Sequence, residues 1–130
     1  MNKKILVTGA FIGVLGIILG AFASHGLKEL ITKEAQQSFE TGVRYQMYHA
    51  FVLLLIGSTS FLKEKPKKII FVLLFLGVFL FSGSIYGLST NELTAFDFKS
   101  IALITPVGGL LLILGWLIML INLLKMKGDI

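Results

Sequence analysis

The side chains best suited to chemistry gather in one stretch, residues 39–50, where polar and ionisable groups lead into a long apolar segment. They comprise a carboxylate, a guanidinium, a phenol, an amide and an imidazole, namely Glu40, Arg44, Tyr45, Gln46 and His49. Glu40 and Arg44 are four residues apart with the acid first, which is the favourable order for an ion pair on a helix. Alternatively, the long side chain of Arg44 could extend to lipid headgroups.

The two histidines are the most versatile of the candidate groups. A buried imidazole is either a neutral, hydrogen-bonded structural group or a carrier of a proton, ligand or metal. His25 and His49 could in principle bind haem or, with Glu40, a divalent metal, but no spacing demands either. Ser82 or Ser84 could be combined with His49 as a nucleophile and its base, but nothing in the sequence indicates that these residues meet. We therefore predict no catalytic, cofactor or metal site, and no enzymatic activity.

The composition indicates what positions these groups. Of the 130 residues, which suit one domain, 55% are hydrophobic and 15% are charged, whereas soluble domains have roughly 45–50% and about 25%. The absence of cysteine excludes disulfides and thiolate chemistry. The net charge of +5 comes from lysines beside apolar blocks, which favours membrane lipids over nucleic acid as the partner.

Four apolar blocks are long enough for helices that cross the roughly 30 Å hydrocarbon core of a bilayer. We predict spans at residues 5–24, 43–62, 69–88 and 105–124. The fold class is then an all-α integral membrane protein, a four-transmembrane-helix bundle in one domain. A signal peptide is the alternative for the first block, but this block is longer than a signal core.

The segments between the spans are polar. Apolar residues near helical spacing predict an amphipathic outer segment between the first two spans, at Leu27, Leu30, Ile31, Ala35 and Phe39. Thr32 is a candidate N-cap for a helix that begins near Lys33 and could run to Leu62. The basic run at residues 63–68 is interpreted as a solvated turn beside headgroups.

The start of the fourth span can be drawn in two ways. A helix from about Ser100 would kink at Pro106, whereas a helix capped by Thr105 would hold Pro106 at its first position. We prefer the second, because proline has no N–H to leave unpaired there. Trp116 then falls in mid-span, so its indole N–H needs a partner or a position facing the bundle.

Glycines repeat on one face of the first span, at Gly9, Gly13, Gly16 and Gly20. Small residues let helix backbones approach closely in lipid. We predict that this face packs within the monomer, and the alternative is the seam of a homo-oligomer.

Positive charges choose the orientation of four spans, whose two termini share one side. The termini and the 63–68 loop carry eight lysines, and the other side carries four basic residues, Lys28, Lys33, Arg44 and Lys99. The positive-inside rule therefore predicts that both termini are cytoplasmic.

This orientation brings polar groups from all four spans to the outer side. The predicted cluster consists of His25, Glu40, Arg44, Tyr45, Gln46, His49, Ser82, Ser84, Tyr86 and Thr105. They would meet either to bind and transport a small molecule or ion or to hold four helices together. We favour holding, in a protein that contacts lipid or a membrane-protein partner.

Four motifs in order carry a family resemblance: residues 20–27 (GAFASHGL), 39–50 (FETGVRYQMYHA), 81–86 (FSGSIY) and 104–109 (ITPVGG), the last followed by Gly115 and Trp116. The set resembles the domain of unknown function 423 family, the YgdD- and YwdK-like inner-membrane proteins, to which eukaryotic transmembrane protein 256 is similar. The family has Gly-Ala where this chain has Ala23 and Ser24, a small-for-small exchange. The resemblance implies a four-span protein of the bacterial cell membrane and implies no reaction.

Overall fold

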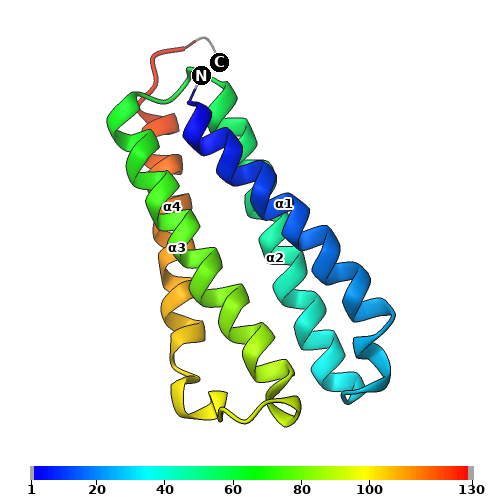
Figure 1. The fold of residues 1–130 in the computed structure, drawn as a ribbon. Helices are drawn as coiled ribbons and strands as arrows, with labels where there is room; N and C mark the ends of the chain where they lie inside the picture. Colours follow the sequence, from blue (N-terminus) through cyan, green and yellow to red (C-terminus); the bar gives the residue numbers. More distant parts are fainter. Residues whose placement is uncertain (1, 129–130) are drawn as a thin grey trace.

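The computed structural model describes residues 2–128, which fold into four long α-helices joined by short connections. The helices are α1 (Lys3–Ser24), α2 (Lys33–Ser58), α3 (Glu64–Ser89) and α4 (Ile104–Leu124). Figure 1 shows two antiparallel hairpins side by side, with the start of α1 and the end of α4 at the same end of the bundle. α1 packs on α2, α2 on α3 and α3 on α4. The predicted all-helical class is confirmed.

Three helical segments are long and apolar enough to cross a membrane: α1, α3 and the stretch Phe98–Leu124, which includes α4. This stretch includes the short 3₁₀ helix η3 (Phe98–Ile101), and η2 (Asn91–Leu93) lies between α3 and η3. α2 is not among them, because Arg44, Gln46 and His49 lower the hydropathy of even its more apolar part, residues 41–58.

The start of α2 is as predicted, but its end is not. Thr32 is the N-cap, and its Oγ1 accepts a hydrogen bond of 3.1 Å from the Ala35 N–H. The helix ends at Ser58 rather than near Leu62, because Thr59 adopts an extended backbone and its hydroxyl donates to the Leu55 carbonyl. Between α1 and Thr32 the only helical element is the 3₁₀ helix η1 (Leu27–Glu29). The predicted amphipathic segment is therefore one short turn, continued by the polar first turns of α2.

The sequence suggested that the basic run at residues 63–68 is solvated, but one of its lysines is buried. Lys67 is only 2% exposed, and its Nζ donates a 2.8 Å hydrogen bond to the Thr59 carbonyl just beyond α2. Glu64 lies 3.8 Å from the same ammonium and also accepts from the Asn2 amide at 3.0 Å. The lysine thus satisfies a carbonyl at the end of α2 and joins the start of α3 to it.

The start of α4 differs from both ways of drawing it. The helix begins at Ile104, so Pro106 is its third residue and still lies in the first turn, where its missing N–H breaks no helical bond. Thr105 does not cap the helix. Its hydroxyl is instead 2.6 Å from the hydroxyl of Ser84 on α3. A tertiary hydrogen bond has replaced the expected local one.

The glycine face of α1 lies against α2, in agreement with the prediction that it packs within the monomer. A Cβ at Gly9 would lie 3.1 Å from the Ala50 carbonyl oxygen, and one at Gly20 would lie 3.4 Å from Val43. Gly13 faces Ala50, and Gly16 faces Met47 so closely that a Cβ would displace it. This face is covered within the chain, so it is not free to form an oligomer seam.

The buried core runs along the middle of the bundle, while the outward faces are apolar too. Leu53, Ile56, Ile70 and Leu74 are fully buried between the helices. Large apolar side chains are nevertheless exposed on each helix, for example Ile17, Phe51, Phe79 and Leu110. Helices that are apolar all round are typical of membrane spans.

Candidate functional site

His49, on α2, is the central group of the candidate site. It is only 3% exposed, and both ring nitrogens are hydrogen-bonded. The indole N–H of Trp116 donates to Nε2 at 3.0 Å, while Nδ1 is 2.6 Å from the Tyr45 carbonyl oxygen. Indole nitrogen only donates and a carbonyl only accepts. The proton therefore sits on Nδ1, and the ring is the neutral tautomer.

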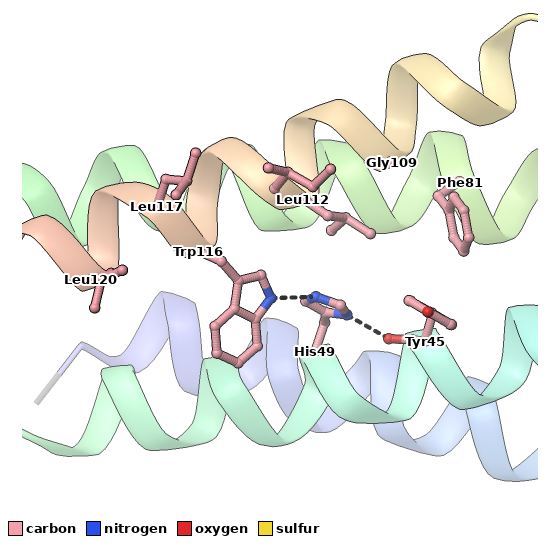
Figure 2. A pocket seen from close by; sticks show the side chains of 9 residues that line it. Tyr45, His49, Phe81, Gly109, Leu112, Trp116, Leu117 and Leu120 are labelled. Carbon is pink, nitrogen blue, oxygen red and sulfur yellow. Dashed lines mark hydrogen bonds between the residues drawn. The ribbon is translucent and has the colours of Figure 1, made fainter.

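A groove of about 590 Å³ lies between α2 and α4 beside this pair. Figure 2 shows the imidazole and the indole pointing at each other across it. Its walls are otherwise almost entirely apolar: Tyr45, Phe81, Gly109, Leu112, Ile113, Leu117 and Leu120 complete the lining. Because His49 and Trp116 satisfy each other, the groove offers little free polarity to a ligand.

Aromatic rings line one end of the groove. The Tyr45 ring packs on Phe81 of α3 with centroids 4.9 Å apart, and it stacks beside His49 at 6.5 Å. Tyr48 extends this edge at 5.7 Å from Tyr45. The Tyr45 side chain is 39% exposed, so these rings are not sealed inside the bundle.

A second polar group ties α1, α2 and α3 together. Gln46 is buried; its amide nitrogen donates to the Ile12 carbonyl at 2.9 Å, and its amide oxygen accepts from the Tyr86 hydroxyl at 2.5 Å. The Ser82 hydroxyl donates to the Gly42 carbonyl at 2.7 Å. Each of these bonds joins two different helices. They act as polar fasteners between helices whose contacts are otherwise apolar.

The ten predicted cluster residues therefore do not meet at one place. Ser84 and Thr105 form a separate contact between α3 and α4. His25 is exposed beyond the end of α1, and Glu40 forms no ion pair with Arg44 among the described residues. Arg44 instead donates to the Thr41 hydroxyl at 2.8 Å. The expected single cluster and the expected Glu40–Arg44 pair are both wrong.

Two residues of the site were not in the predicted cluster. Trp116 is the partner of His49. Its position in mid-span, where the indole N–H needs an acceptor, was the signal in the sequence that could have identified it. Ser89 is buried near the end of α3, and it had no signal in the sequence beyond its place after the third apolar block. Within residues 2–128, no three His, Cys, Asp or Glu side chains are grouped to hold a metal ion.

Comparisons with known proteins give a consistent result. A family described as "Protein of unknown function (DUF423)" matches residues 19–109. The chain is 36% identical to the UPF0382 membrane protein YwdK of Bacillus subtilis, over 95% of this chain and 98% of that protein. It is 32% identical to the UPF0382 inner membrane protein YgdD of Escherichia coli, over 97% and 93% of the two chains. No solved structure matches it.

Proposed function

The chain belongs to the DUF423 family of membrane proteins, and we propose that it is a four-span protein of the bacterial cell membrane with a non-enzymatic role, exerted through contacts with lipid or a membrane-protein partner. One observation carries the proposal. The buried polar side chains His49, Gln46 and Ser82 are each occupied in hydrogen bonds that join or brace helices, whereas the outward faces are apolar.

α2 is the fourth span in this proposal. It runs antiparallel to α1 and α3 along their lengths (Figure 1) and packs on both. Its 26 residues correspond to about 39 Å at 1.5 Å per residue. The first turns, Lys33–Ser38, would lie at the headgroups, and residues 39–58, about 30 Å of helix, would cross the hydrocarbon, with the Arg44 side chain extending back to the headgroups.

The termini are cytoplasmic in this proposal, because the side with the termini and the α2–α3 turn carries most of the lysines. The chain has no cysteine, so single cysteines can report on topology without a background. A membrane-impermeant maleimide added to intact spheroplasts should label Lys28→Cys and Glu92→Cys and leave Lys65→Cys unlabelled until the membrane is opened. The reverse pattern would overturn the orientation, and equal labelling of Lys28→Cys and Lys65→Cys would overturn the span at α2.

Native mass spectrometry of the protein released from its membrane tests the role. We expect the chain to carry bound lipid, or a second membrane protein, at detergent concentrations that strip an unrelated four-helix membrane protein. Recovery as a bare single chain under the same conditions would contradict the proposal.

A second candidate function is the binding or transport of a small molecule or ion in the groove. The observation that favours it is the space of about 590 Å³ beside His49, to which three helices contribute side chains. A His49→Ala protein should keep its helical content and lose a copurifying small molecule. If the variant retains the same bound species in the same amount, this second function is excluded.

A further inference from the structure

A small pocket lies near the end of the bundle that carries the α1–α2 and α3–α4 connections. It has a volume of about 200 Å³ and is lined by Ala35 and Ser38 of α2 and by Ile85, Leu88 and Ser89 of α3. Ser89 is only 6% exposed. Its hydroxyl is the one buried side-chain polar atom in the described part of the chain without a hydrogen-bond partner. A buried, unpaired hydroxyl is costly, and in a pocket wall it indicates a missing partner.

The pocket and the groove share one face of the α2–α3 pair. On α2, Ser38, Tyr45 and His49 are seven and four residues apart, so they lie on one side of the helix. On α3, Phe81, Ile85 and Ser89 follow one another at intervals of four. The Tyr45–Phe81 ring contact at 4.9 Å lies between the two spaces. The two spaces therefore follow one another along this face, and we call the line from Ser89, past these rings, to Trp116 the track.

The two parts of the track differ in what they need. The groove presents apolar side chains and a histidine–tryptophan pair that is already satisfied, so an apolar chain fits it. The pocket is lined by Ser89, whose buried hydroxyl has no partner, and by the exposed Ser38, among apolar walls. One water, with about 30 Å³ of liquid volume, fills little of it, and apolar walls give further waters too few partners.

We propose that this track is a binding site for a membrane glycerophospholipid. An ester or hydroxyl oxygen of the glycerol region lies at Ser89, and one acyl chain passes Tyr45 and Phe81 into the groove beside Trp116. Ser38 and His49 are eleven positions apart, which corresponds to about 16 Å of helix. This length matches one leaflet, which is half of the roughly 30 Å hydrocarbon core. The inference rests on the proposed lipid-contacting role and names the place where the lipid binds.

Trp116 is the only tryptophan of the chain, so its fluorescence reports on the groove. Purified protein in detergent is titrated with phosphatidylglycerol that carries brominated acyl chains, which quench indole emission on contact. We expect saturable quenching at one lipid per chain. Ser89→Ala should weaken the apparent affinity about fivefold, as expected for one lost hydrogen bond.

Ser58→Ala is the matched control, since this exposed serine lies at the other end of α2 and only bonds back to the Leu55 carbonyl. It should bind like the unaltered protein, and circular dichroism checks that both variants keep their helices. Quenching that rises without saturation, or equal affinity in Ser89→Ala and the unaltered protein, would overturn the site. The site would also be overturned if native mass spectra showed that the protein whose Trp116 is not quenched is a dimer. Lipid that stays bound in native spectra without quenching Trp116 would overturn this site and leave the proposed role standing.

Discussion

The two sides of α4 are packed differently: one is in close contact with α3, and the other lines the groove. The adjacent glycines Gly108 and Gly109 lie on these two sides. Toward α3, a Cβ at Gly108 would lie 2.8 Å from the backbone carbon of Leu80, and one at Gly115 would lie 2.7 Å from Leu74. On the groove side, a Cβ at Gly109 would meet only the Phe81 ring of α3, at an ordinary 3.6 Å. Here α4 and α2 enclose the groove, which is bridged by the Trp116–His49 hydrogen bond.

This difference teaches how a membrane bundle divides its surfaces. Lipid chains are as apolar as leucine, so hydrophobicity alone does not decide which faces of a helix meet another helix. Close approach, and the dispersion energy that comes with it, needs small residues at matching levels. The α3 side of α4 has them, and the α2 side has Ile113, Leu117 and Leu120 instead. The large side chains leave a space that a lipid can enter.

The largest effect is expected when the tight side is blocked. Gly108→Val places a branched side chain where the backbone of α3 lies, so α4 must move away. We expect a loss of at least about 3 kcal/mol in the free energy of unfolding, at the upper end of overpacking costs. Gly109→Ala, one residue away, should change it by less than about 0.5 kcal/mol. Thermal unfolding in detergent measures both, and similar losses would contradict the contrast between the two sides.

An intermediate effect is expected from truncating side chains. Leu112 is buried against Gly77, whereas Leu117 is 46% exposed in the groove. Leu112→Ala should destabilise by about 2 kcal/mol, the low end for leucine truncation, since in lipid mainly the cavity contributes. Leu117→Ala should cost less than about 0.5 kcal/mol. A larger loss for Leu117 would mean that the groove is closed in the folded protein.

The smallest effect is expected from cutting the one bond across the groove. Trp116→Phe keeps the aromatic ring and removes the donor to His49 Nε2. We expect a loss of about 1 kcal/mol, within the range for hydrogen bonds between membrane helices. The ¹⁵N chemical shift of Nε2 should move as the bond is lost. An unchanged shift would show that Trp116 is not the partner of His49.

Several features were predictable because they depend on nearby residues. The Thr32 cap follows from a hydroxyl beside a helix start, and the packing of Gly9, Gly13, Gly16 and Gly20 follows from their spacing on one face. The need of Trp116 for a partner follows from its place in mid-span. The identity of that partner could not be predicted, because it depends on how two helices that are distant in the sequence are rotated and staggered.

The failures have the same cause. An exposed Glu40–Arg44 pair gains little in water, and Arg44 found Thr41 one turn away instead. Lys67 looked like a solvated charge until the turn brought the Thr59 carbonyl within reach. Ser84 and Thr105 are 21 residues apart, and only the α3–α4 packing makes them neighbours.

The sequence by itself determined the helical class, the apolar segments and which faces carry small residues, since these follow from the order of side chains along a helix. Only the tertiary structure decided how the polar groups are shared out. They form separate pairs rather than one cluster, because packing decides which acceptor lies within reach of a buried donor. It alone also decided that residues 39–50 supply one wall of a groove, with His49 already satisfied and Ser89 left without a partner.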